Sequence, residues 1–145
     1  MVETVTFLTQ RGIPVCAHLG LTPQSVHQLG GFRVQGREAE AAQRLRDDAK
    51  RLQASGASML VLEAVPAALA RLISPELAIP TIGIGAGVDT DGQVLVLQDM
   101  LGLYPRPSPK FSKNFMEGAD SIEAAVKTYV EAVRGKTFPG PEHSY

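Results

Sequence analysis

Residues 59–65 are Met59-Leu60-Val61-Leu62-Glu63-Ala64-Val65, and this stretch decides the fold class of the chain. Its short, nearly continuous apolar run is typical of a strand buried on both faces of a parallel sheet. Glu63 is the only ionisable residue in the run. An unpaired carboxylate in such a place is costly, so we expect Glu63 to be neutral, paired or retained for chemistry. Active sites of parallel α/β proteins lie at the carboxyl ends of the strands, which makes Glu63 the first candidate for a catalytic group.

The rest of the chain repeats a unit of one helix followed by one strand. Apolar residues at helical spacing predict helices, and short apolar runs after Gly or Pro predict strands. Helices are expected over residues 2–11, 37–54, 66–73 and 121–133, and strands over residues 13–17, 59–65, 81–84 and 93–97. Asp120 and Glu123 have the spacing of a capping box before the last helix. A Pro-rich loop is expected over Tyr104–Pro109, and the tail over Phe138–Tyr145 is expected to be irregular.

Four apolar strands separated by helices predict an α/β fold whose parallel sheet is covered on both sides. Two architectures remain open at this point, a doubly wound sheet and part of an eight-stranded barrel. A complete barrel typically needs about 250 residues. A chain of 145 residues with four strands would therefore supply half of one.

The composition excludes several classes of partner. The 14 basic and 15 acidic residues nearly cancel and form no basic stripe, so nucleic acid is not expected as a partner. No apolar run approaches the roughly 20 residues of a membrane helix, and the first residues have no pattern of a secretion signal. We therefore expect no membrane partner and a cytoplasmic location. The single cysteine, Cys16, lies in an apolar run and is expected to be a small buried core residue.

Chemically distinctive residues stand where the expected strands end. His18 follows the first strand, Glu63 ends the second, the Gly85-Ala86-Gly87 segment follows the third, and Asp99 follows the fourth. Because the carboxyl ends of parallel strands share one side of a sheet, these groups are predicted to converge on one crevice. Taken alone, His18 also fits a hydrogen-bonded structural histidine, and Asp99 fits the cap of a turn. The convergence therefore carries more weight than any one residue.

Two glycine-rich loops need separate interpretation. The segment Ile82–Gly87 resembles a phosphate-binding loop only weakly, since no helical pattern follows it. A tight strand end, packed against a neighbour or a small substrate, is the better prediction for Gly85 and Gly87. The segment Asp89–Gly92 lacks the later glutamate of a calcium loop and is predicted to be a turn. The long loop over Gly20–Gly36 is predicted to act as a lid.

Seven motifs, in order along essentially the whole chain, resemble the carboxyl-terminal portion of the ketopantoate hydroxymethyltransferase family. They are His18-Leu19-Gly20-Leu21-Thr22-Pro23-Gln24-Ser25, Gly30-Gly31-Phe32-Arg33-Val34-Gln35-Gly36, Leu60-Val61-Leu62-Glu63-Ala64-Val65-Pro66, Pro80-Thr81-Ile82-Gly83-Ile84-Gly85-Ala86-Gly87, Asp91-Gly92-Gln93-Val94-Leu95-Val96, Pro109-Lys110-Phe111 and Phe138-Pro139-Gly140-Pro141-Glu142-His143-Ser144-Tyr145. The resemblance implies a (β/α)8 TIM barrel of the phosphoenolpyruvate/isocitrate-lyase-like superfamily. Residues 1–145 would be the carboxyl-terminal half of that single domain and supply about its last four strands.

The resemblance also implies an activity. It is the transfer of a one-carbon unit from methylenetetrahydrofolate to the α-keto acid 3-methyl-2-oxobutanoate, with Mg²⁺ as cofactor, to give ketopantoate for pantothenate biosynthesis. Glu63 matches the family's proton acceptor, while the family's metal ligands are expected in an amino-terminal half that this sequence does not match. Two positions depart from the family: Ala64 stands where Cys is common, and Gln98 stands where His is common. The chemistry agrees with the residues, since forming the new bond at C3 of a keto acid calls for a base.

Other readings remain open at this stage. One alternative is a carbon-carbon lyase or mutase of the same barrel superfamily, although the Thr22–Ser25 and Glu142–Tyr145 segments favour the transferase. Another is a truncated, non-catalytic fragment that needs a partner chain. Half a barrel leaves two sheet edges without partners, so a monomer is not expected. A homo-oligomer is predicted, and the resemblance implies a decamer for the complete enzyme.

Overall fold

The computed structural model describes residues 1–103 and 108–145. Most of the loop predicted over Tyr104–Pro109 therefore lies outside the described residues. The helices are α1 Val2–Thr9, α2 Ala39–Ala54, α3 Ala67–Ile73, α4 Leu97–Met100 and α5 Ile122–Arg134; the strands are β1 Cys16–Gly20, β2 Met59–Glu63, β3 Thr81–Ile84 and β4 Gly92–Gln93; and short 3₁₀ turns are η1 Pro23–Ser25, η2 Ser74–Glu76 and η3 Pro141–His143. Within the described ranges, no helix has the length and apolar character needed to cross a membrane.

The four strands form one parallel sheet in the order β1-β2-β3-β4. Strands that are neighbours in sequence are therefore neighbours in space, and the order never reverses. Gly20 of β1 lies opposite Glu63 of β2, and Glu63 lies opposite Ile84 of β3. The predicted α/β fold with a parallel sheet is confirmed.

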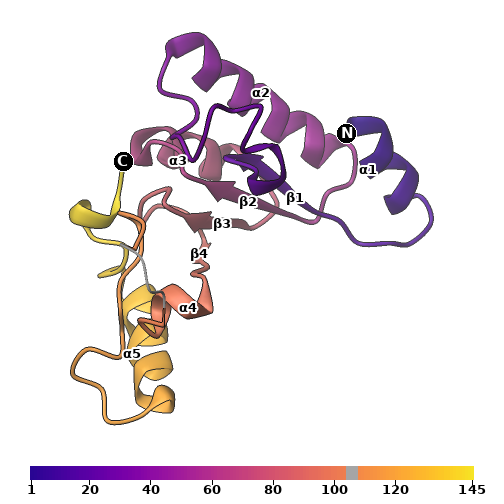
Figure 1. Ribbon diagram of the computed structural model, residues 1–145. Coiled ribbons are helices and arrows are strands. Elements are labelled where there is room, and N and C mark those ends of the chain that lie inside the picture. The colour runs from indigo at the N-terminus through magenta and orange to yellow at the C-terminus, as the bar shows by residue number, and fades with distance from the viewer. Residues whose placement is uncertain (104–107) are drawn as a thin grey trace.

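The helices cover one face of this sheet. Leu60 and Leu62 of β2 are fully buried in a core that they share with residues of the first three helices. Figure 1 shows α2 lying along this side of the sheet, whereas α4 and α5 are grouped apart from it beyond β4. On the other face, the side chains of Met59, Val61 and Glu63 are only partly buried. The prediction of a sheet covered on both sides is therefore wrong for the described residues, because burial alternates along β2 although the sequence does not.

A second apolar cluster lies around α4 and α5. The aromatic rings of Phe115, Tyr129 and Phe138 pack edge to face, with centroids 5.3 to 5.9 Å apart. The Tyr129 hydroxyl donates to the Gln93 carbonyl oxygen at 2.9 Å, which ties α5 to β4. Burial raises the pKa of the Tyr129 phenol. This cluster fixes the carboxyl-terminal third of the chain beside the last strand.

The predicted apolar face of the last helix is divided in the structure. Tyr129 and Val133 pack into the second cluster, whereas Ile122, Val126 and Val130 are exposed. The helix cap also differs from the prediction. Ser121, and not Asp120, occupies the N-cap, and its hydroxyl accepts a hydrogen bond from the amide of Ala124 at 3.1 Å.

Three further sequence predictions are wrong in detail. The first strand begins at Cys16 and not at Ile13. Cys16 itself is exposed, because it points to the uncovered face of the edge strand. The fourth strand is only two residues long, and Leu97 starts a helix. The described residues offer β4 no partner strand on its far side, so a longer strand would leave backbone groups without hydrogen bonds.

Candidate active site at the carboxyl ends of the strands

His18 and Glu63 meet on the uncovered face of the sheet. His18 lies opposite Val61, and Val61 shares its face with Glu63 because side chains alternate along a strand. The His18 Nε2 atom lies 3.1 Å from Glu63 Oε2, with the two side chains 31% and 14% exposed. Among the described residues, Nε2 completes no hydrogen bond of good direction. The distance therefore defines a close contact between the imidazole and the carboxylate, without a hydrogen bond between them.

The main chain around Glu63 is held from three sides. The amide of Leu21 donates to the Glu63 carbonyl oxygen at 2.8 Å. The amide of Gln35 donates to the Ala64 carbonyl oxygen at 2.9 Å. The amide of Ala64 donates to the Ile84 carbonyl oxygen at 2.8 Å. Ala64 adopts a φ of 47°, a left-handed conformation that costs a residue with a Cβ about 1–2 kcal/mol. Such strain persists only where surrounding contacts hold it, and it is common at functional sites.

The long loop over Gly20–Gly36 is attached to this corner at both ends, through the amides of Leu21 and Gln35. Leu21 is 2% exposed, so the first anchor is buried. Phe32, near the middle of the loop, is 79% exposed. The lid function of this loop stays a prediction.

Gly85 and Gly87 form a tight strand end, as the pattern predicts. A Cβ atom at Gly85 would lie 2.9 Å from the ring of Phe111, and one at Gly87 would lie 2.5 Å from the Cβ of Ala67. The side-chain amide of Gln93 donates to the Gly87 carbonyl oxygen at 2.9 Å. These glycines therefore allow the loop after β3 to pack closely beside the residues that follow Glu63.

Asp99 was predicted to stand at the end of the fourth strand. In the structure it lies inside α4. It is 5% exposed, and burial raises the pKa of its carboxyl group. Within the described ranges it makes no hydrogen bond or ion pair with His18 or Glu63. The structure thus brings His18, Glu63 and the glycine loop to one edge of the sheet, and leaves Asp99 in α4.

We expect Asp99→Asn to stabilise the chain at neutral pH. The raised pKa means that the folded state disfavours the charged carboxylate, so stability falls as the pH rises from the ordinary Asp pKa, about 3.9, through the folded pKa. Urea unfolding at pH 7 should therefore give a higher midpoint for the variant. The gain should shrink as the pH is lowered towards 4, and a gain that is constant with pH would contradict the burial argument.

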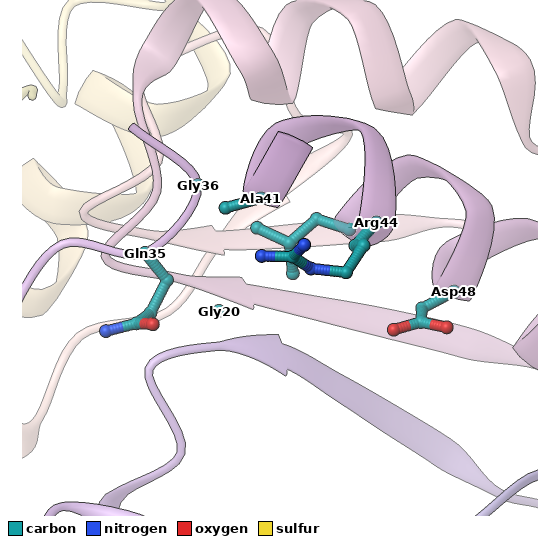
Figure 2. A pocket seen from close by; sticks show the side chains of 7 residues that line it. Gly20, Gln35, Gly36, Ala41, Arg44 and Asp48 are labelled. Atoms are coloured by element: carbon teal, nitrogen blue, oxygen red, sulfur yellow. The ribbon is translucent and has the colours of Figure 1, made fainter. Parts of the chain in front are cut away.

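Two cavities flank the edge strand β1. The smaller, about 210 Å³, reaches Gly20, and Figure 2 shows the Arg44 side chain lying between Gln35 and Asp48 at its wall. The larger, about 710 Å³, runs along β1 and contains His18. Polar residues that the sequence reasoning did not select also line the larger cavity: Thr22, Gln24, Ser25 and Asp48. The motif after β1 was the signal for the first three of these, since it joins polar residues directly to the His18 strand.

The described residues hold no group of three His, Cys, Asp or Glu side chains arranged to bind a metal ion. Asp91 is engaged elsewhere, because its carboxylate accepts hydrogen bonds from the amide and hydroxyl of Thr81 at 2.7 and 2.8 Å. Asp89 lies in a turn before β4, which confirms the turn prediction up to Asp91, whereas Gly92 begins the strand.

A profile of the ketopantoate hydroxymethyltransferase family matches residues 1–141. This chain belongs to that family. Three relatives, each named 3-methyl-2-oxobutanoate hydroxymethyltransferase, are 66% identical over 145 residues in Methylobacillus flagellatus, 63% over 145 in Thiobacillus denitrificans and 61% over 146 in Burkholderia multivorans. Each match covers 100% of this chain but only 55%, 55% and 54% of the relative.

The chain thus spans about half the length of the curated relatives it matches. Membership of the ketopantoate hydroxymethyltransferase family confirms the resemblance inferred from the ordered motifs.

Proposed function

We propose that this chain is part of a hydroxymethyltransferase that adds a one-carbon unit from methylenetetrahydrofolate to 3-methyl-2-oxobutanoate, giving ketopantoate. One observation carries the proposal. A carboxylate, Glu63, stands at the carboxyl end of a central parallel strand, 3.1 Å from an imidazole, in a chain that belongs to this family. The transferase is favoured over a lyase or mutase because each of the three relatives named above bears the transferase name.

The proposed architecture is a (β/α)8 barrel of the phosphoenolpyruvate/isocitrate-lyase-like superfamily. The sequential strand order supports it, since a doubly wound sheet has a point where the order reverses. Coverage of a single face also supports it, because a barrel carries helices only on its outside. Residues 1–145 would supply about the last four strands, and the uncovered face with His18 and Glu63 would line the interior.

In the proposed reaction Glu63 acts as the general base. Its carboxylate takes the proton from C3 of the keto acid, and the electron pair of that bond forms an enolate over C2, C3 and the ketone oxygen. C3 then forms a bond to the methylene carbon of the folate as one carbon–nitrogen bond of that carbon breaks. Water displaces the second folate nitrogen and supplies the new hydroxyl oxygen. The proton taken from C3 and one proton of the water end on the two nitrogens of the tetrahydrofolate that leaves. His18 orients the Glu63 carboxylate and faces the substrate. A base in this role typically contributes 10²–10⁴-fold to the rate, or about 3–5 kcal/mol.

Mg²⁺, which the family resemblance implies, has no fitting ligand set among the described residues. Asp99 is buried in α4, and Asp91 is bound to Thr81. The ligands of the metal would come from polypeptide outside the described residues, and Gly85 and Gly87 remain candidate contacts for the substrate.

We propose that the protein is cytoplasmic and homo-oligomeric, with a decamer for the complete enzyme. Both edges of the sheet lack a partner strand among residues 1–103 and 108–145, and α5 carries exposed apolar residues; both features support association. The expected result of sedimentation velocity over a hundredfold range of concentration is a species larger than 15.5 kDa. A folded 15.5 kDa species at every concentration would reject association of the chain by itself.

The function is tested by following the C3 proton of 3-methyl-2-oxobutanoate in D2O by NMR, with the active enzyme that contains this chain. Enzyme-dependent loss of the C3 signal without folate, and ketopantoate formation with methylenetetrahydrofolate, are expected. Cleavage of a carbon-carbon bond in place of exchange would favour the lyase reading. Absence of both reactions in every assembly would favour a non-catalytic fragment.

A further inference from the structure

The carboxyl-terminal segment Phe138–Tyr145 returns to the Glu63 corner. The main-chain oxygen of Tyr145 accepts a hydrogen bond from the amide of Ala67 at 2.8 Å, only four residues after Glu63. Figure 1 shows the C-terminus beside α3, far in sequence from β2. Phe138, at the other end of the segment, is 3% exposed and belongs to the second core cluster. The segment therefore spans from that cluster to the main chain just beyond the candidate base.

Lys110 and Phe111 connect this segment to the glycine loop. The Lys110 ammonium donates to the Ser144 carbonyl oxygen and lies 5.1 Å from the centre of the Tyr145 ring. Phe111 fills the space that Gly85 leaves open. Tyr145 is partly buried in this arrangement, and that burial raises the pKa of its phenol.

These contacts surround the segment from Glu63 to Ala67, which contains the strained residue Ala64. Gly87 packs against Ala67, and the amide of Ala64 donates to the Ile84 carbonyl oxygen. Ala64 is in the left-handed conformation, which persists only where surrounding contacts hold it. The direction of the main chain after Glu63 therefore depends on the contacts of the residues that follow it. The hydrogen bond from the Lys110 side chain joins the segment of Lys110 and Phe111 to the carboxyl-terminal segment.

We propose that Lys110 and Tyr145 are positioning residues that hold the Glu63 carboxylate against His18. The proposal deepens the proposed function and rests on it, since Glu63 is the base there. It also gives a physical role to two motifs, Pro109–Phe111 and Phe138–Tyr145, that the reaction itself does not use. Neither residue touches Glu63, so both act through the main chain of residues 64–67.

The test compares Lys110→Met with Lys110→Arg in the chain as it stands. Lys127→Met is the matched control, because Lys127 is an exposed lysine on α5. The readouts are the His18 imidazole cross-peak in ¹H–¹³C NMR and amide hydrogen exchange at Ala64 and Ala67. A purely structural role for Lys110 would leave the His18 cross-peak unchanged in folded protein, since His18 contacts Glu63 and not the carboxyl-terminal segment.

Lys110→Met is expected to shift the His18 cross-peak and to accelerate exchange at Ala64 and Ala67 by about tenfold. Lys110→Arg should retain the wild-type values, and Lys127→Met should change neither. Folded Lys110→Met with an unchanged cross-peak would overturn the proposal. Tyr145→Ala should shift the same cross-peak through loss of the ring under Lys110.

If Lys110→Met does not fold, native-state hydrogen exchange of the unaltered chain decides the question. The amides of Ala64 and Ala67 should then open together and before that of Leu60, which lies in the core. Separate opening of Ala67, with Ala64 exchanging only on global unfolding, would overturn the proposal. No substrate is used in these measurements, so their failure is distinguishable from failure of the proposed transferase function.

Discussion

Glu63→Gln should reduce exchange of the C3 proton of 3-methyl-2-oxobutanoate by about 10²–10⁴-fold in the active enzyme that contains this chain. The amide has nearly the same shape as the carboxylate but cannot accept the proton. Because Glu63 is 14% exposed and lies at a strand end, the fold should tolerate the change. Exchange is followed by NMR in D2O, and folding by circular dichroism.

The matched control for this variant is Glu131→Gln, since Glu131 is an exposed glutamate on α5. It should leave exchange at the wild-type rate. His18→Gln should reduce exchange less than Glu63→Gln does, because His18 orients the base and does not take the proton. Wild-type exchange in folded Glu63→Gln would remove Glu63 from the mechanism.

Gly20→Ala should destabilise the chain by about 4 kcal/mol or more, which is among the largest effects of single substitutions. The residue has a φ of 90°, and its added Cβ would lie 2.1 Å from the Glu63 carbonyl oxygen. That oxygen is main chain and also accepts the Leu21 hydrogen bond, so it cannot move away without disturbing the corner. Urea unfolding measures the loss.

Gly12→Ala separates the two causes of this destabilisation. Gly12 also has a positive φ, 76°, but an added Cβ there meets no atom within 4 Å. It should therefore show only the conformational cost of about 1–2 kcal/mol. Equal losses in the two variants would show that the close approach at Gly20 has no energetic consequence, and that the Glu63 main chain is free to shift.

The elements that carry the candidate site could be predicted because they depend on local patterns. The apolar run around Glu63, the glycine after β3 and the helical spacing in α2 each specify one element without reference to the rest of the chain. The ordered motifs likewise identified the family, since they are a property of the sequence alone. His18 and Glu63 were selected for the same reason, as polar groups next to apolar strands.

The boundaries at the sheet edges could not be predicted in this way. Whether Val94 and Val96 extend a strand depends on a partner strand beyond β4, and the described residues provide none. The exposure of Cys16 has the same origin, since it faces the uncovered side of an edge strand. Asp99 was misplaced because the fourth strand ends at Gln93 and a new helix, α4, begins at Leu97.

The sequence by itself determined the α/β class, the family and the candidate base, because periodicity and motifs are encoded residue by residue. Only the tertiary structure decided that the helices cover one face, that His18 lies 3.1 Å from Glu63, and that the carboxyl-terminal segment returns to Ala67. The last two features join residues that are 45 or more positions apart. Their geometry follows from strand register and from the packing of the whole chain, which no local pattern specifies.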